Sequence, residues 1–506
     1  MDKGCMDDSG RRETAERLRA IALEAIRTCD AGRALGRATG GDRAAVVLAG
    51  RPLRLVSSGR VLILACGKAA TPMHDAFVDR LRAAGARRPV QSLVIAPAAR
   101  APVARRRDGA APSTQRSGAA ITEQTRPAAA RRAGAGAPGA GAKSAASPAP
   151  PLRSLRVTRV AAEHPAPGSG SFRAGRAALR FMAGARPADD VVALVSGGGS
   201  SLMAMPLAPF LTAAQKSALH RVLVASGAPI GSINTVRKHL SAVKGGRLAV
   251  AAHRARSLTT MVLCDVDTER FEEVASGPTT PDRTTLDDLV AVIDRHGLAP
   301  ALPDRILDAL RRGRLPETPK PRDAAFRRAR AHLMLSNADL RNAAVRAGLT
   351  RGLAAEAMPT EITGPVEEAV ELVARAIEGA PAGLRLLVLG GETRTAPGGI
   401  GLGGRAQEFA LRLAVRMRNL SVRGWAFLAA GSDGVDGLSP AAGAYVDATT
   451  LDRAAALRLD AARTLARAET WRFFHRLGDD VVTGPTATNV RDLHLLLTGL
   501  PRPAGR

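Results

Sequence analysis

Aromatic residues and cysteines are scarce in this sequence. Aromatic side chains make up 3% of the 506 residues, with one Tyr and two Trp. This scarcity leaves no platform of rings on which the bases of a single-stranded nucleic acid could stack. The four cysteines form no Cys-x-x-Cys pair. This pattern indicates reduced thiols and argues against a zinc site or a disulfide framework.

Long apolar runs are also missing. No stretch approaches the roughly 18 apolar residues that a membrane-spanning helix needs. Residues 1–16 lack the apolar core of a signal peptide. We therefore expect a cytoplasmic protein that does not enter a membrane. The 506 residues, of which 45% are hydrophobic, suffice for two domains or more, and they are compatible with a homo-oligomer.

Basic residues exceed acidic ones along the whole chain. The sequence holds 73 Lys and Arg against 46 Asp and Glu, and only seven of the basic residues are Lys. Because the excess of Arg is spread evenly, it predicts no specific nucleic-acid surface. Residues 97–152 are almost all Ala, Arg, Pro, Gly and Ser without hydrophobic periodicity, which predicts a disordered, basic insertion. A scaffold or nucleic-acid binder acting through this insertion is one alternative class of function.

The chain is organised around residues 191–201. The apolar residues 191–195 predict a buried strand, and a glycine-rich turn and a helix start follow it. Backbone N–H groups at such a turn can surround an anion, and glycine lets a ligand approach the backbone closely. The residues predicted to hold phosphate are Ser196, Gly197, Gly198, Gly199 and Ser200. A tight turn without a ligand is the alternative interpretation.

Several other expected strands also end in polar residues. Strands 61–66, 258–263, 332–335, 384–389 and 425–430 are followed, in this order, by Lys68, Asp265, Asn337, Glu392 and the pair Asp433 and Asp436. Ligands of open α/β sheets bind beyond the carboxyl ends of the strands. The repeated pattern therefore predicts an α/β fold with an active site at these ends. Each residue by itself also fits a turn, a helix cap or a solvated surface position.

Two further stretches predict helices. Residues 231–248 are expected to bury their apolar positions and to place Arg237, Ser241 and Lys244 together on another face. Two cations there suit a phosphate or a carboxylate, and a solvated basic face is the alternative. A second helix is expected to follow residues 483–489 and to include Leu493 and Leu496.

The polar residues together fit phosphoryl transfer. Lys68 and Arg405 supply positive charge, and Asp265, Asp433 and Asp436 supply the hard oxygens that Mg²⁺ prefers. No P-loop motif and no protein-kinase signature occurs in the sequence. The spacing Gly399-x-Gly401-x-x-Gly404 fits a dinucleotide fingerprint by letter only. No strand directly precedes it, and no acidic residue follows about 20 positions on.

These motifs together resemble those of the class II glycerate kinases, a family of glycerate 2-kinases whose members are often labelled hydroxypyruvate reductases. The matching stretches are residues 66–70, 163–165 with Pro167, 194–201, 233–248, 275–279, 403–405, 407–408, 431–437 and 483–489. They cover nearly the whole chain except the segment 97–152.

The resemblance implies an ATP- and Mg²⁺-dependent phosphorylation of D-glycerate to 2-phosphoglycerate. It implies a Rossmann-like domain over residues 1–96 and 153–320, a smaller C-terminal MOFRL-type domain over 330–500, and an active site in the cleft between them. Lys68 and Arg405 are then the expected catalytic residues, and Asn337 joins the glycine loop as a phosphate or nucleotide ligand. Arg237, Lys244 and Glu392 are expected to bind substrate.

The sequence also departs from the family pattern. Thr268-Glu269 stands where the family has Gly-Asp, Ala406 stands where Asn is usual, and Gly168 stands where Asp is usual. A member with weakened activity therefore stays an alternative, as does an NAD(P)H-dependent hydroxypyruvate reductase.

Overall fold

In the computed structural model most of the chain forms two compact units. The described residues are 8–40, 46–48, 50–56, 58–98, 121–126, 152, 154–266, 268–395, 401–418, 420, 422, 424–486 and 488–500. We call the first unit, within Ala34–Leu263 and Glu269–Met334, the N-unit. We call the second, within Met1–Arg33, Cys264–Thr268 and Leu335–Arg506, the C-unit.

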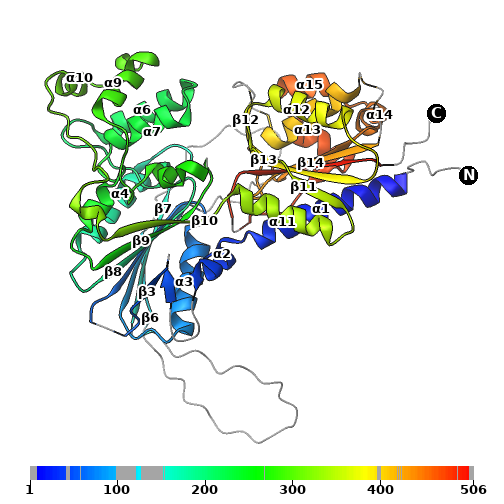
Figure 1. The fold of residues 1–506 in the computed structure, drawn as a ribbon. Helices are drawn as coiled ribbons and strands as arrows, with labels where there is room; N and C mark the ends of the chain where they lie inside the picture. Colours follow the sequence, from blue (N-terminus) through cyan, green and yellow to red (C-terminus); the bar gives the residue numbers. More distant parts are fainter. Residues whose placement is uncertain are drawn as a thin grey trace, which may run out of the picture. The chain divides into compact units, whose positions relative to one another are not determined.

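A mostly parallel sheet forms the centre of the N-unit (Figure 1). Its strand order is β10-β9-β8-β4-β5-β7-β6. The bounds are β4 (Val61–Cys66), β5 (Val90–Pro97), β6 (Ile121–Arg126), β7 (Leu155–Ala162), β8 (Asp190–Val195), β9 (Ser257–Leu263) and β10 (Ala329–Leu335). Strands β9, β8, β4, β5 and β7 run parallel, and β6 pairs antiparallel with β7. Every residue of β4 and β8 is buried, as expected for central strands covered on both faces.

Helices cover both faces of this sheet. Helix α3 (Ala70–Ala83) connects β4 to β5, and α4 (Ser169–Ala183) connects β7 back to β8. The two connections run in opposite directions across the sheet, so right-handed crossovers put α3 and α4 on opposite faces. The direction reverses between β4 and β8, and such a switch point is where open α/β sheets bind ligands.

A helical layer joins β8 to β10. It contains α5 (Gly199–Leu202), α6 (Ala213–Ala225), α7 (Ile230–His239), α8 (Arg247–Ala251), α9 (Leu286–Arg295), α10 (Asp304–Arg311) and the 3₁₀ helices η1 (Thr268–Ser276), η2 (Ala299–Ala301) and η3 (Ala324–Phe326). The capping box of α6 is present, since Thr212 accepts from the Gln215 backbone. The predicted helix 231–248 is wrong in extent, because the chain leaves the helical conformation after His239. Arg237, Ser241 and Lys244 therefore do not share a helix face.

Shorter elements complete the N-unit. Helix α2 (Ala31–Ala38) leads into a small antiparallel sheet of β1 (Thr39–Gly40), β2 (Val46–Leu48) and β3 (Arg51–Leu53). Within the segment expected to be disordered, β6 is a strand at the sheet edge. Apart from β6, Pro97, Ala98 and Leu152, that segment lies outside the described residues.

A mixed sheet forms the centre of the C-unit. Its strands are β11 (Ala354–Ala357), β12 (Ile362–Pro365), β13 (Arg385–Arg394), β14 (Trp425–Gly431), β15 (Gly443–Asp447), β16 (Asp480–Val481) and β17 (Asp492–Thr498). The order is β11-β13-β17-β14-β15-β16, and β12 also pairs with β13. Strand β17 lies antiparallel between β13 and β14. The expected helix containing Leu493 and Leu496 is therefore wrong, because both residues belong to this central strand.

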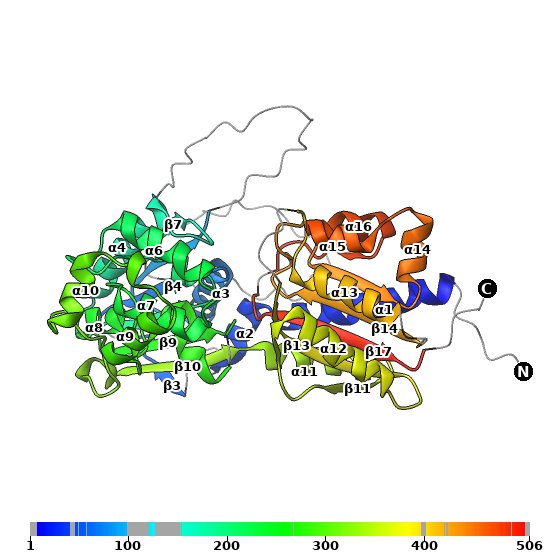
Figure 2. The ribbon, with the colours of Figure 1, turned by 90° about the horizontal axis from the view of Figure 1, so that it is seen from above.

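Helices also cover both faces of the second sheet (Figure 1). They are α1 (Asp8–Thr28), α11 (Asn337–Leu349), α12 (Val366–Glu378), α13 (Arg405–Arg418), α14 (Thr450–Ala456), α15 (Ala461–Arg467) and α16 (Thr470–Leu477). Figure 2 shows α12 and α13 side by side over the sheet, and the two helices pack against each other. The predicted N-terminal helix buries Leu18, Ile21 and Ala25 as expected. It groups with the C-unit, whereas the expected first domain began at residue 1.

The described part of the chain bears on membrane-spanning helices and on disulfides. No helix there is long and apolar enough to cross a bilayer. Cys29, Cys66 and Cys264 are buried and free of disulfides. Burial raises the pKa of the Cys66 thiol to about 12, so it is protonated at neutral pH.

Candidate active site

Two loops meet at the switch point of the N-unit sheet. The Lys68 backbone N–H donates to the Gly197 carbonyl at 2.8 Å, and the Ala69 N–H donates to the Ser196 hydroxyl at 3.1 Å. Gly67 has φ +128°, and a Cβ there would lie 2.2 Å from the Ser196 Oγ. Glycine is therefore required at Gly67 for the loops to approach this closely. The side chain of Lys68 is exposed at this junction.

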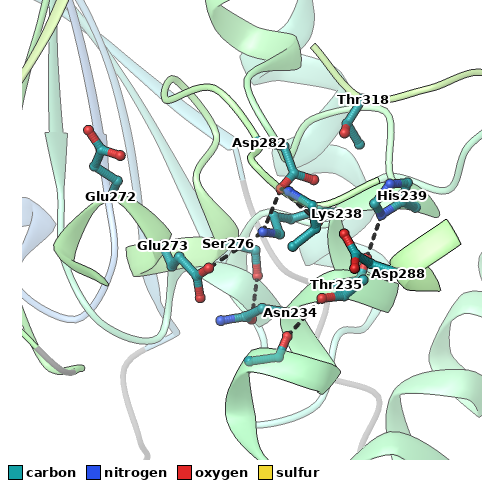
Figure 3. Close-up of polar contacts among 12 residues, drawn as sticks. Asn234, Thr235, Lys238, His239, Glu272, Glu273, Ser276, Asp282, Asp288 and Thr318 are labelled. Carbon is teal, nitrogen blue, oxygen red and sulfur yellow. Dashed lines mark hydrogen bonds and ion pairs between the residues drawn. The ribbon is translucent and has the colours of Figure 1, made fainter. Parts of the chain in front are cut away.

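The glycine loop is also tied to helix α7. The Ser200 and Ser276 hydroxyl oxygens lie 2.7 Å apart, and Ser276 donates to the Asn234 side-chain oxygen at 3.0 Å. Figure 3 shows the Ser276–Asn234 contact beside a buried ion pair of the same helix. There Lys238 Nζ lies 2.7 Å from Asp282 and 3.5 Å from Glu273. These contacts fix α7 against the 272–282 segment.

A pocket lined by basic side chains lies beside this loop. Lys216 and His220 of α6, Arg237 of α7 and Lys244 line it together with Ser200 and apolar residues. We call these four basic residues the basic cluster. Lys216 Nζ donates to the Leu240 carbonyl at 2.7 Å, and Lys244 Nζ donates to the Met203 carbonyl at 3.1 Å. The turn after α7, and not a helix face, brings Arg237 and Lys244 to one pocket.

Burial and mutual repulsion shift the pKa values of the basic cluster downward. Burial lowers the pKa of Lys244 to about 7 and that of His220 to about 4. The pKa of Lys216 lies well below its ordinary value, through burial first and then through Lys244, Arg237 and Arg247. Arg237 Nε is buried without a hydrogen-bond partner. Within the described residues, Lys216, Arg237 and Lys244 have no ion-pair partner, so the pocket is suited to an anion from outside.

Arg405 is the centre of the second cluster, which lies in the C-unit. It is the first residue of α13, and its Nε and Nη2 donate to the two oxygens of Asp492 at 2.7 and 3.0 Å. Its Nη1 donates to Glu392. Burial opposes the guanidinium charge, but Asp492 and Glu392 outweigh this effect and raise the pKa of Arg405. The guanidinium has five N–H donors, so two remain for a ligand.

The Asp436 carboxylate accepts hydrogen bonds at the start of α13. Its two carboxylate oxygens accept from the Ala406 and Gln407 backbone N–H groups at 3.1 and 2.9 Å. Burial, helped by Asp492, raises the pKa of Asp436 to about 7. This carboxylate is 3% exposed and both of its oxygens are used by the helix. As it lies, it does not fit a Mg²⁺ site.

The other predicted acidic and amide residues also lie in the C-unit. Asn337 donates both amide hydrogens, to the Val490 and Asp492 carbonyls at 2.8 and 2.9 Å, and so connects α11 to β17. Asp265 Oδ2 lies 3.4 Å from the Asn489 side-chain nitrogen. One oxygen of Asp433 accepts from the Val435 N–H at 3.2 Å.

No cluster of three metal-ligating side chains occurs among the residues that the structure describes. Mg²⁺ keeps several waters and is usually bound by one or two carboxylates together with substrate phosphates. Asp265 and Asp433 are partly exposed and fit such a role. A cage made by the protein alone is not needed.

The sequence reasoning missed three residues of these clusters. Lys216 and His220 are spaced by four on α6, which puts them on one face beside Leu219 and Leu223. Two basic residues on an apolar helix face were the available signal. Asp492 gave none, because it stood in a segment interpreted as a helix.

One departure from the family pattern has a local explanation. Glu163 accepts from the Gly170 and Ser171 backbone N–H groups at 3.1 and 2.9 Å at the start of α4. A Cβ at Gly168 would lie 2.6 Å from the Glu163 carboxyl carbon, so a larger residue there would displace this cap. The Thr268 and Glu269 side chains lie outside the described residues.

A glycine loop at the switch point of an α/β sheet, beside a pocket of cations without ion-pair partners in the described part of the chain, defines an enzyme that handles anionic ligands. Two family models match the chain. The family model described as Domain of unknown function (DUF4147) matches residues 17–311, and that of the MOFRL family matches residues 385–492.

Named relatives and a solved structure identify the family. A relative from Agrobacterium vitis, which carries the label of a hydroxypyruvate reductase, is 39% identical over 68% of this chain and 78% of the relative. D-glycerate 2-kinase of Thermotoga maritima is 34% identical over 66% of this chain and 78% of its own length. The crystal structure of a glycerate kinase from Thermotoga maritima covers 96% of this chain and 100% of its own, with a TM-score of 0.69 and 26% identity. The chain belongs to the class II glycerate kinase family.

Proposed function

We propose that this protein transfers the γ-phosphoryl group of ATP to the 2-hydroxyl of D-glycerate and forms 2-phosphoglycerate. The observation that supports this most strongly is the junction of the Lys68 and Ser196 loops at the switch point, close to a pocket of cations that lack acidic partners among the described residues. Phosphoryl transfer is catalysed mainly by positioning and by neutralising the charge of the transferring group. An exposed lysine beside a glycine loop is suited to both tasks.

The described residues divide these tasks. The loop Ser196–Ser200 is proposed to hold nucleotide phosphate, and Lys68 is proposed to neutralise the transferring phosphoryl group. The two N–H donors of Arg405 that Asp492 and Glu392 leave unused are proposed to bind a phosphoryl oxygen. Mg²⁺ would neutralise phosphate charge when it is bound. Asp265 or Asp433 is proposed to hold it.

Lys68 and Arg405 belong to different units, and their action in one cleft stays a prediction that variants can test. Lys68→Ala and Arg405→Ala should each lower kcat by about 10²–10³-fold, the usual cost of removing a group that stabilises developing charge. Arg254→Ala is the matched control, because Arg254 is exposed and is not among the residues that line the basic pocket. It should retain the rate of the unmodified protein.

The assay is phosphorus and proton NMR of the product after incubation with ATP, Mg²⁺ and D-glycerate. Formation of 2-phosphoglycerate that depends on all three components supports the proposal. Oxidation of NADH with hydroxypyruvate, in the absence of phosphoryl transfer, would favour the reductase alternative. Full activity of both Lys68→Ala and Arg405→Ala would refute the site assignment.

A further inference from the structure

The lysines of the basic cluster differ from Lys238, another buried lysine of the N-unit, in their ion-pair partners. Lys238 follows Arg237 directly in α7, and it has Asp282 at 2.7 Å and Glu273 at 3.5 Å as partners. Buried charges are ordinarily paired in this way, because an unpaired charge in a low-dielectric interior is costly. Lys216, Lys244 and Arg237 have no such carboxylate among the described residues. Among the described residues, the fold therefore places carboxylates beside the structural Lys238 and none beside the lysines of the pocket.

The donors of the basic cluster remain available in the pocket. A lysine ammonium has three N–H donors and no acceptor. Lys216 and Lys244 each use one of them on a backbone carbonyl, at 2.7 and 3.1 Å. In the charged form two donors on each lysine are left, and among the described residues the Arg237 Nε is buried without a partner. The Ser200 hydroxyl lines the same pocket, and it connects the pocket to the glycine loop.

The size of the pocket limits the group that can enter. Its volume is about 20 Å³, somewhat above the roughly 10–15 Å³ that one water molecule requires. This space admits one or two oxygen atoms, as a carboxylate presents, and not the three terminal oxygens of a phosphate.

We propose that the basic cluster binds the carboxylate of the acceptor, and that Lys216 determines the enzyme's specificity for a small 2-hydroxy acid over the corresponding alcohol. This inference rests on the proposed function and deepens it, since Lys216 is not part of any motif used above. Without Lys216, one of the cations that compensate the carboxylate is lost, while the glycine loop and Lys68 are untouched.

Binding of the carboxylate should be coupled to proton uptake. The charged and titratable groups around the pocket are Lys216 and His220 from α6, Arg237 from α7, Lys244 from the following turn, Arg247 from α8 and Cys66 from β4. Burial lowers the pKa of Lys244 to about 7 in the empty pocket, and a bound anion raises it again. Affinity is therefore full below about pH 7, and it falls as the pH rises, by up to about tenfold per unit.

The test uses Lys216→Met and Lys244→Met, which keep an unbranched side chain that is one atom shorter and remove the charge. Arg221→Met is the matched control, because Arg221 is an exposed residue of the same helix. Calorimetry should show the Kd for D-glycerate raised about tenfold or more in both lysine variants and unchanged in Arg221→Met. In kinetics, KM for D-glycerate should rise while KM for ATP stays within about twofold. Discrimination of D-glycerate from glycerol should fall in Lys216→Met.

Three results would overturn the inference. An unchanged Kd for D-glycerate in both lysine variants would exclude the carboxylate site. A rise of KM for ATP alone, with inorganic phosphate competing for the pocket, would assign the pocket to a phosphate. Equal heats of D-glycerate binding at pH 8 in HEPES and Tris, whose ionisation enthalpies differ, would exclude proton uptake.

The design separates this inference from the proposed function. If Lys216→Met does not fold, as judged by circular dichroism, Arg237→Gln at the partly exposed edge of the pocket replaces it. Binding of D-glycerate without phosphoryl transfer would contradict the proposed function and leave the pocket assigned. Phosphoryl transfer with unaltered KM for D-glycerate in Lys244→Met and Arg237→Gln would contradict the pocket alone.

Discussion

Asp492 should control how well Arg405 works, and Asp492→Asn tests this. The substitution keeps the shape of the side chain but removes its charge and one of the two acceptors that Arg405 uses at 2.7 and 3.0 Å. Breaking a fully buried ion pair costs about 3–5 kcal/mol. The Arg405 side chain is 34% exposed, and solvent screening reduces the cost. We expect a loss of about 2–3 kcal/mol in the free energy of unfolding of the C-unit.

Activity separates a positioning role from a merely structural one. In Asp492→Asn the guanidinium keeps its charge but loses its fixed orientation, so kcat should fall about tenfold, less than in Arg405→Ala. Added guanidinium ion should partly restore Arg405→Ala, but not the double variant with Asp492→Asn. Glu392→Gln is the control for the stability measurement. Glu392 is 40% exposed, so the free energy of unfolding should fall by less than about 1 kcal/mol.

Two outcomes would refute this reasoning. Asp492→Asn with unchanged kcat and unchanged urea midpoint would mean that Asp492 does not hold Arg405. Equal rescue of the single and double variants by guanidinium would mean that orientation by Asp492 is irrelevant to the reaction.

Two further predictions concern pH and the basic segment. Because the fold raises the pKa of Asp436 from 3.8 to about 7, its contribution to stability is fully present below about pH 4 and is lost as the pH rises through 7. Urea unfolding between pH 4 and 8 should show this slope, Asp436→Asn should flatten it, and an identical slope in the variant would contradict the assignment. Deleting residues 127–150 and replacing Arg100, Arg105, Arg106, Arg107 and Arg116 with Ser removes the charge of the basic segment outside β6. Four residues remain between Arg126 and Leu155, which pair in β6 and β7, so kinase activity should survive. Loss of activity together with loss of salt-sensitive binding to heparin would instead favour the polyanion-binding alternative.

The sequence predicted the parallel sheet well because its strands are continuous apolar runs that end at glycine or polar residues. Residues 61–66 and 191–195 are apolar throughout and include several β-branched residues, and the observed strands follow them closely. Strand β17 was mistaken for a helix because a short apolar run bears no periodicity that separates a buried strand from a buried helix. Its partners β13 and β14 are distant in sequence. Pairing with them makes the segment a strand, and this pairing cannot be predicted from the local sequence.

The candidate site was predicted in its residue types better than in its geometry. Lys68 and the loop that begins at Ser196 were found from local signals, and their loops do meet. Arg237 and Lys244 were expected to meet through a helix that in fact ends at His239. They meet through a turn instead, and tertiary packing brings Lys216 to them. The roles of these residues in catalysis stay predictions.

The position of α1 has a consequence for synthesis of the protein. Its apolar side, with Leu18 and Ile21 fully buried, packs on α11 and β14, which the ribosome makes more than 300 residues later. During translation this apolar surface stays uncovered until residues 337–349 and 425–431 have been made. A fragment that begins at Leu335 would lack the helix altogether, and should aggregate unless residues 8–28 are supplied as a separate peptide.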